Sequence, residues 1–327
     1  MVEPFKEYYG NGKIRRELYY NANNELNRED GPAYIEYYEN GNIKSMDYYI
    51  DGEFHREDGP AYIDYYENGN AKHEWYFIDN KCHRENNPAR ISYYSNGNIN
   101  HEEYYTNGDM HREDGPACII YHQNGQLASI SFHINGKEHR EDGPAVVEYY
   151  SNGNIRSEER YINGNVHRNN GPAEISYYKN GNIEFKRYCI NGKCHREDGP
   201  AEIYYHENGN ICSKEYYING NVHREDGPAY IEYDEDGEIL REMYYLNNKV
   251  HREDGPADIS YEPQRDFYYI NGINLTQEYN KYKKKLTKRM IKMQNDINVL
   301  KIMKIVCKNN NDELLELVES KILTLIL

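Results

Sequence analysis

The sequence predicts an all-β repeat protein, an elongated, twisted antiparallel β-meander of about nine two-stranded units with a C-terminal α-helical cap. Three observations predict this class. A seven-residue phrase returns every 28 residues, Asn-Gly pairs separate β-rich runs, and 37 tyrosines outnumber 6 phenylalanines. Tyrosine rings bury apolar area while their hydroxyls need water or a partner, which suits a thin sheet. A parallel β-solenoid with one 28-residue coil per turn is the alternative.

The repeated phrase is His-Arg-Glu-Asp-Gly-Pro-Ala. It occurs in full from His55, His111, His139, His195, His223 and His251, and close variants begin at Asn27, His83 and His167. All nine starts are 28 residues apart, so one supersecondary unit is stacked along the chain. We therefore expect a degenerate half-repeat at 1–26, nine repeats at 27–273 with the last one shortened, and a helical tail at 274–327.

Each unit contains two turns. In the unit 55–82, a β-rich run at 62–67 meets Asn68-Gly69, which predicts a two-residue type I′ hairpin. The chain then returns to a second turn whose second position is always Gly or Asn, and Asn87 also replaces the Gly before Pro once. Both residues tolerate positive φ, so we expect left-handed backbone at both sites. The segment from the second turn to the next hairpin is expected to form one long strand, bent at Gly-Pro.

The two faces of the sheet differ in how much they vary. With an Asn-Gly loop, Ile35 lies opposite Met46, and Ala33, Ile35 and Tyr37 share one face. These three columns barely change between repeats, whereas the first two columns of the opposite face, those of Tyr34 and Glu36, change freely. One face is thus expected to pack with the same residues in every repeat, and the other to vary and determine binding specificity.

The tail changes character after residue 276. Apolar residues there follow 4-3-4-3 spacing, at Leu286, Met290, Met293, Ile297 and Leu300. This spacing predicts a helix, and a second helix is expected at 313–327. The tail either caps the open edge of the last strand or serves as a dimerisation or docking element.

Charge argues against several classes of partner. The net charge is −16, and the tail holds 11 Lys and Arg against 6 Asp and Glu, so residues 1–273 carry −21. Such a region repels phosphate backbones and anionic lipids, so neither nucleic acid nor membrane insertion is expected. No apolar signal core or run of 18 apolar residues occurs, so we expect a cytoplasmic protein, in the host cytoplasm or the virion if it is viral.

The phrases Asn-Gly-x-x-His-Arg, Gly-Pro-Ala and Tyr-Tyr-x-Asn-Gly resemble the membrane occupation and recognition nexus (MORN) repeat. The form is similar to the variant found in bacterial antitoxin-like proteins and in repeat proteins of giant amoeba-infecting viruses. The resemblance covers 8–272, with His-Arg where the family usually has His-Gly. It implies a β-hairpin unit and arrays used as scaffolds, as dimerisation surfaces and, in some members, as lipid-proximal modules.

The repeated phrase itself looks like an acid–base constellation, yet catalysis needs one convergent pocket. We therefore expect its charged side chains to form stacked structural columns. The residues are His55, Arg56, Glu57, Asp58, Gly59, Pro60 and Ala61, with His111, Arg112, His139, Arg140, His195, Arg196, His223, Arg224, His251 and Arg252. Histidines about 10 Å apart, two strand spacings, cannot share a metal ion. No catalytic residue, metal site or cofactor is predicted.

Cys189 and Cys194 flank the turn at Asn191-Gly192 and should face each other across two strands. Such a pair lies within reach of a disulfide. In a reducing compartment free thiols are expected.

The predicted function is a non-enzymatic scaffold that binds another protein through the variable face of the sheet. The alternative is an antitoxin-like inhibitor that neutralises a toxin or host enzyme with its acidic surface. A homodimer through residues 276–327 is a further expectation.

Overall fold

The computed structural model describes residues 3–290, and its account of side chains ends at Lys284. The chain divides into two compact units, which are described separately. Unit 1 comprises Met1–His167 and Ala173–Gly181, and unit 2 comprises Arg168–Pro172 and Asn182–Leu327.

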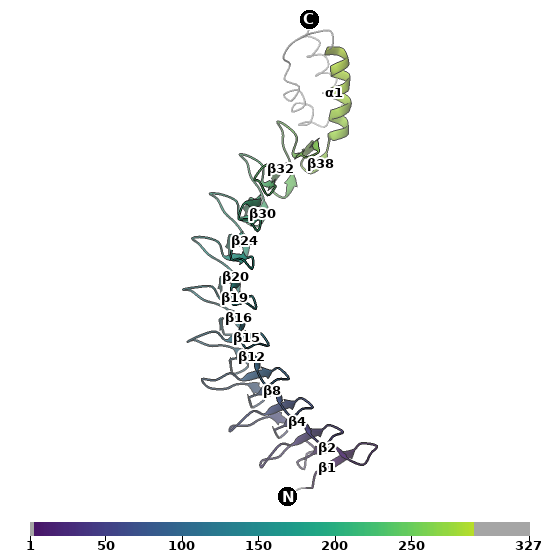
Figure 1. Cartoon of the computed structure of the whole chain (residues 1–327), viewed down its shortest axis with the longest axis vertical. Coiled ribbons are helices and arrows are strands. Elements are labelled where there is room, and N and C mark those ends of the chain that lie inside the picture. The colour runs from purple at the N-terminus through teal and green to yellow at the C-terminus, as the bar shows by residue number, and fades with distance from the viewer. Residues whose placement is uncertain (1–2, 291–327) are drawn as a thin grey trace. The chain divides into compact units, whose positions relative to one another are not determined.

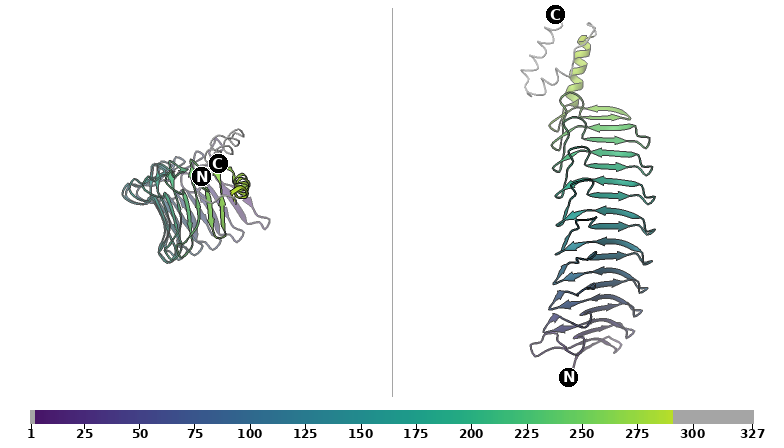
Figure 2. Two further views of the ribbon diagram at one scale, coloured as in Figure 1. Left: turned by 90° about the horizontal axis from the view of Figure 1, so that it is seen from above. Right: turned by 90° about the vertical axis from the view of Figure 1, so that its left-hand side faces the viewer.

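Unit 1 is an antiparallel meander of hairpins. Its long strands are β1 (Phe5–Tyr8), β2 (Ile14–Leu18), β3 (Tyr34–Tyr37), β4 (Ile43–Asp47), β7 (Tyr62–Tyr65), β8 (Ala71–Trp75), β11 (Arg90–Tyr93), β12 (Ile99–Glu103), β15 (Cys118–Tyr121), β16 (Leu127–Ser131), β19 (Val146–Tyr149), β20 (Ile155–Glu159) and β23 (Glu174–Tyr177). Each strand pairs with its neighbours along the chain, and successive hairpins lie side by side (Figures 1 and 2).

The predicted register is confirmed. Ile35 pairs with Met46 within one hairpin, and Met46 pairs with Ile63 of the next repeat. Because the strand pairs within both units are antiparallel, the predicted all-β meander is confirmed and the parallel solenoid is not supported.

Each repeat also contains a second, short hairpin outside the main sheet. In unit 1 these are β5 (Tyr49–Ile50) with β6 (Glu53–Phe54), β9 (Phe77–Ile78) with β10 (Lys81–Cys82), β13 (Tyr105–Thr106) with β14 (Asp109–Met110), β17 (His133–Ile134) with β18 (Lys137–Glu138), and β21 (Tyr161–Ile162) with β22 (Asn165–Val166). Each repeat is therefore two hairpins rather than two strands, because the chain leaves the sheet at Tyr48 and re-enters it at Ala61. From here on, repeats are counted from the alanine, so that 33–60 is one repeat and 61–88 is the next.

The expectation of one long strand through His-Arg-Glu-Asp-Gly-Pro-Ala is wrong. This segment forms bends, not strand, and the N–H of Arg56 donates to the carbonyl of Phe77 in the next repeat at 3.1 Å. Pro60 has no N–H to donate to a neighbouring strand, and this lack also keeps the segment out of the sheet.

The two turns differ in type. At the short hairpin, Asp51 (φ 48°) and Gly52 (φ 78°) are both left-handed, so the predicted left-handed turn is confirmed there. The type I′ prediction for the main hairpin is wrong. Only Gly41 is left-handed (φ 97°), and the N–H of Tyr38 donates to the Asn42 carbonyl across a three-residue loop.

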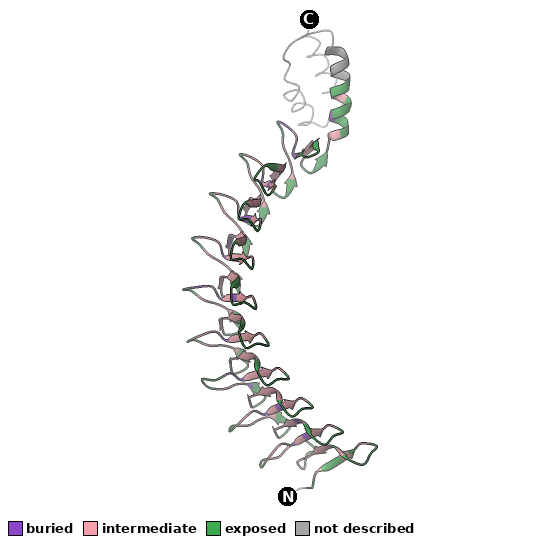
Figure 3. Cartoon of the chain, in the orientation of Figure 1, coloured by how far each residue is buried: buried purple, intermediate pink, exposed green. Residues whose placement is uncertain are grey.

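The core is thin, as the tyrosine content predicts. Small alanines at the start of each long hairpin are at most 1% exposed, namely Ala33, Ala61, Ala89, Ala117, Ala145, Ala173, Ala201, Ala229 and Ala257. Among the described residues, no large side chain is fully buried. Figure 3 shows most strands as half-buried and the turns as exposed.

Unit 2 repeats the same plan and ends in a helix. Its long strands are β24 (Ile183–Arg187), β27 (Glu202–Tyr205), β28 (Ile211–Glu215), β31 (Tyr230–Tyr233), β32 (Ile239–Met243), β35 (Asp258–Tyr261) and β36 (Gln264–Phe267). Its short strands are β25 (Cys189–Ile190), β26 (Lys193–Cys194), β29 (Tyr217–Ile218), β30 (Asn221–Val222), β33 (Tyr245–Leu246), β34 (Lys249–Val250), β37 (Tyr269–Ile270) and β38 (Ile273–Asn274).

Helix α1 (Thr276–Met290) starts where the tail was predicted to turn helical. Tyr279 is buried on Tyr268 of the last repeat, with ring centroids 3.8 Å apart, and the Thr276 hydroxyl accepts from the Tyr268 N–H at 3.0 Å. The first turns of the helix therefore dock on the last repeat. The second predicted helix lies outside the described residues.

Candidate functional site

The histidine of the repeated phrase connects each repeat to the next. The N–H of Asn135 donates to Nδ1 of His111 at 3.1 Å, and Asn163 does the same to His139. In unit 2 the same bond joins Asn219 to His195, Asn247 to His223 and Asn271 to His251. An imidazole that accepts at Nδ1 carries its proton on Nε2, so this geometry suits neutral histidine.

The arginine packs within its own repeat. The Arg56 guanidinium lies 4.0 Å from the centre of the Tyr48 ring, its Nε donates to Asp58 at 2.8 Å, and its Nη1 donates to the Pro60 carbonyl at 3.3 Å. The same stack over the residue eight positions earlier occurs at Arg112, Arg140, Arg196, Arg224 and Arg252. The carboxylate partner is two residues away, so in this phrase the short ion pair is local.

A side chain at the glycine of this phrase would crowd the arginine. A Cβ at Gly59 would lie 2.7 Å from Arg56 Cζ, and the same distance at the equivalent glycines is 2.9 to 3.2 Å. The prediction of left-handed backbone here is wrong for all but Gly171 (φ 117°). Where Asn87 replaces the glycine, it is the preceding Asn86 that is left-handed (φ 58°). Glycine is therefore favoured here because the guanidinium lies against it, although one repeat accommodates Asn87.

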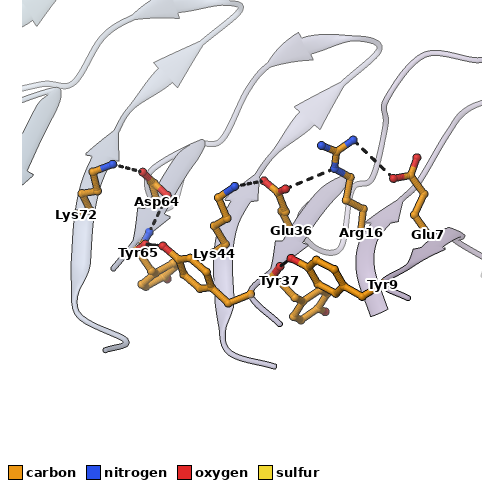
Figure 4. Close-up of polar contacts among 10 residues, drawn as sticks. Glu7, Tyr9, Arg16, Glu36, Tyr37, Lys44, Asp64, Tyr65 and Lys72 are labelled. Carbon is orange, nitrogen blue, oxygen red and sulfur yellow. Dashed lines mark hydrogen bonds and ion pairs between the residues drawn. The ribbon is translucent and has the colours of Figure 1, made fainter. Parts of the chain in front are cut away.

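Tyrosine hydroxyls form further links at the other end of the main hairpins. Tyr38 Oη donates to the Tyr65 carbonyl at 2.8 Å, and Tyr66 Oη donates to the Tyr93 carbonyl at 2.9 Å. Tyr9 makes the equivalent bond to Tyr37 (Figure 4). These bonds give half-buried tyrosine rings the polar partner that their hydroxyls need.

The variable face consists of the strand side chains opposite the alanine column. In the first full repeat these are Tyr34, Glu36, Ser45 and Asp47, and the same set recurs every 28 residues. The third of these positions illustrates the variation, with Ser45, His73, His101, Ser129, Ser157, Phe185, Ser213 and Arg241. Most of these side chains are half-buried, so the face combines fixed geometry with changing chemistry.

Near the N-terminus the variable face carries a row of alternating charge (Figure 4). Arg16 lies 3.6 Å from both Glu7 and Glu36, and Lys44 lies 3.1 Å from Glu36. Asp47 has no hydrogen-bond partner at Oδ1, and burial, reinforced by nearby carboxylates, raises its pKa to about 7.

Trp75 is the centre of an aromatic cluster on the same face. Its ring stacks on Tyr62 with centroids 4.7 Å apart, and the Arg90 guanidinium lies 5.0 Å from it. Phe54 and Phe77 of the short hairpins stack nearby, 5.2 Å apart. In unit 2 the face instead holds an ion pair, with Arg241 donating twice to Asp258 at 2.8 Å.

Cys189 and Cys194 pair directly across β25 and β26, in the predicted register. Their Sγ atoms are 3.9 Å apart, in hydrogen-bond contact and without a disulfide. The mutual hydrogen bond and burial raise the pKa of Cys194 far above that of a free thiol.

Sequence reasoning missed one non-repeating cluster. His101, Glu103 and Cys118 bring an imidazole, a carboxylate and a thiol together on the variable face. The signal was available only through the pairing of one repeat with the next, which places Cys118 directly opposite Glu103.

Five segments of the chain match the model of the MORN repeat variant family, at residues 4–22, 33–51, 145–163, 201–219 and 229–247. Four of the matches begin at the alanine of a repeat and end in the short-hairpin turn, and the fifth, 4–22, lies within the predicted N-terminal half-repeat. They support a MORN-type repeat protein, consistent with a non-catalytic binding scaffold.

No curated protein matches the chain. Among solved structures, those of TcdB2-TccC3-TEV and TcdB2-TccC3 are each 12% identical in sequence to this chain. Each alignment covers 84% of this chain and 18% of the other chain, and the TM-scores are 0.13 and 0.15. The Photorhabdus luminescens Tc holotoxin pore is likewise 12% identical, covers 84% of this chain and 17% of its own, and has a TM-score of 0.13. The chain thus spans less than a fifth of these structures' chains. No helix among the described residues is long and apolar enough to span a membrane.

Proposed function

We propose that the protein is a non-enzymatic scaffold that binds another protein through its variable face. One observation carries this proposal. The constant residues are used in stacking one repeat on the next, through bonds such as Asn135 to His111 and Tyr66 to Tyr93, whereas the variable face changes in every repeat. A rigid support with changing side chains is the arrangement of repeat proteins that bind partners.

The aromatic cluster is the best candidate anchor on this face. Trp75, the only tryptophan in the chain, stacks on Tyr62, and Arg90 lies beside it. Tryptophan, tyrosine and arginine are the residues most enriched among those that dominate binding energy at protein interfaces.

The test exchanges the variable face of one hairpin for that of another. In the hairpin of Tyr62 and Trp75, the four face residues would be replaced by those of the hairpin that starts at Val146. These replacements already occupy equivalent positions, so folding should persist. A partner would be identified by cross-linking in the native source, and its dissociation constant measured with both proteins purified.

We expect binding to the exchanged protein to be at least tenfold weaker. The control changes exposed residues of the main-hairpin loop, such as Asn96, and should leave the dissociation constant unchanged. Equal affinity for the wild-type and exchanged proteins would rule out the variable face of this hairpin as the binding surface.

The charge of −21 on residues 1–273 favours one alternative, an inhibitor that neutralises a basic toxin or host enzyme. It would bind one cognate partner, abolish that partner's activity, and lose affinity steeply with salt. A scaffold would leave the partner active. The proposal includes localisation in the host cytoplasm or a virion, which imaging would check. It also includes a homodimer through residues 276–327, which size measurement would check.

A further inference from the structure

We propose that His101, Glu103 and Cys118 form a binding site for one divalent transition-metal ion of the zinc class. The site lies on the variable face of unit 1. His101 and Glu103 are two residues apart on β12, so their side chains share a face, and Cys118 on β15 pairs directly with Glu103. The sheet register therefore brings three ligand types together.

The distances are close to those of a coordination sphere. His101 Nε2 lies 3.2 Å from Cys118 Sγ and 3.3 Å from Glu103 Oε1, and the three ligand atoms all lie within 4.8 Å of one another. Tetrahedral zinc, with bonds of about 2.0–2.3 Å, places neighbouring ligand atoms about 3.3–3.8 Å apart. The remaining pair, a Glu103 oxygen and Cys118 Sγ, lies within 4.8 Å.

The ligand chemistry selects the class of ion. Imidazole with thiolate suits zinc and cobalt, whereas magnesium and calcium require oxygen ligands. Cys118 would bind as the thiolate, with the metal ion displacing its proton. Arg90 approaches Oε2 of Glu103 at 3.9 Å, while Oε1 faces His101.

A hydrogen-bonded cluster without metal is the alternative, and the neighbouring repeat shows what that looks like. His73 occupies the position of His101 one repeat earlier, and its Nδ1 lies 3.0 Å from the Ser92 hydroxyl. Trp75 and Arg90 there replace the carboxylate and thiol. Among the described repeats the complete triad occurs once. Three protein ligands also leave a fourth coordination position for water.

The test titrates Co²⁺ into the full-length, chelator-treated protein. The parent would carry Cys189→Ser and Cys194→Ser, because these two adjacent thiols could bind soft metals themselves. We expect one equivalent of Co²⁺ to produce a sulfur-to-cobalt charge-transfer band, which one equivalent of Zn²⁺ abolishes. Absence of the band in this parent overturns the proposal.

Three substitutions assign the band to the cluster. Cys118→Val and His101→Ser use residues found at the same positions in the repeats of Val146 and Ser129, so folding should be retained, as circular dichroism would verify. Each should remove the charge-transfer band or weaken Co²⁺ binding at least tenfold. The matched control, Cys212→Ser, removes another half-buried thiol and should change nothing. An unchanged band in Cys118→Val, or its loss in Cys212→Ser, overturns the site.

Discussion

Replacing His111 by leucine should open the junction between its repeat and the next. His111 Nδ1 accepts the Asn135 N–H at 3.1 Å, and leucine fills the ring volume without offering an acceptor. This bond is exposed, so water can replace the lost acceptor, and its net loss costs about 0.5–1.5 kcal/mol, or roughly a 2–13-fold increase in local opening. Hydrogen exchange of the Asn135 amide, followed by mass spectrometry, measures this increase directly.

The matched control for this experiment is His111→Asn. In the first copy of the phrase the chain itself uses asparagine, and Asn27 Oδ1 accepts the Asp51 N–H at 2.9 Å. Asparagine keeps the acceptor but loses the contact of His111 Nε2 with Glu113 at 3.8 Å. Exchange in this variant should therefore stay close to wild type. If both variants open equally, the acceptor at Nδ1 is not what holds the junction.

Three further outcomes are expected. Gly59→Ala would push the Arg56 guanidinium off its ring and carbonyl contacts, costing about 1–2 kcal/mol in urea unfolding, and an unchanged midpoint would refute the steric argument. Tyr66→Phe removes the hydroxyl bond to the Tyr93 carbonyl and should cost about 1 kcal/mol, seen as faster exchange at that hairpin rather than in distant repeats. Asp47, whose folded pKa is about 7, contributes stability below about pH 4 that is lost as pH rises through 7. Asp47→Asn should flatten the decline in melting temperature between pH 5 and pH 8, and a parallel decline in both proteins would contradict the burial argument.

The main sheet could be predicted because its signals are local. Alternation and the Asn-Gly pair place Ile35 opposite Met46 even though the loop has three residues rather than two, since a register shift beside Tyr37 absorbs the difference. The left-handed turn at Gly52 likewise follows from the residues allowed there. Helix α1 begins where apolar spacing changes to a helical period.

The rest depends on contacts between segments distant in sequence. The stacking of Arg56 on Tyr48, and hence the preference for Gly59, appears only once the chain leaves the sheet between the two hairpins. The cluster of Glu103 and Cys118 needs the register between repeats, which the hairpin loop does not determine. Local pattern thus predicts the hairpins, and tertiary folding decides how they are joined.

The link from each histidine reaches forward by a single repeat, as in the bond from Asn135 to His111. Within unit 1 or within unit 2, deleting or duplicating one 28-residue repeat would bring together hydrogen-bond donors and acceptors of the same kinds as before. Such an array can change its length by unequal recombination while keeping the histidine hydrogen bond between successive repeats. Its side chains can then diversify one repeat at a time. A new residue on the variable face must be compatible with the two adjacent repeats only, instead of with a whole globular core.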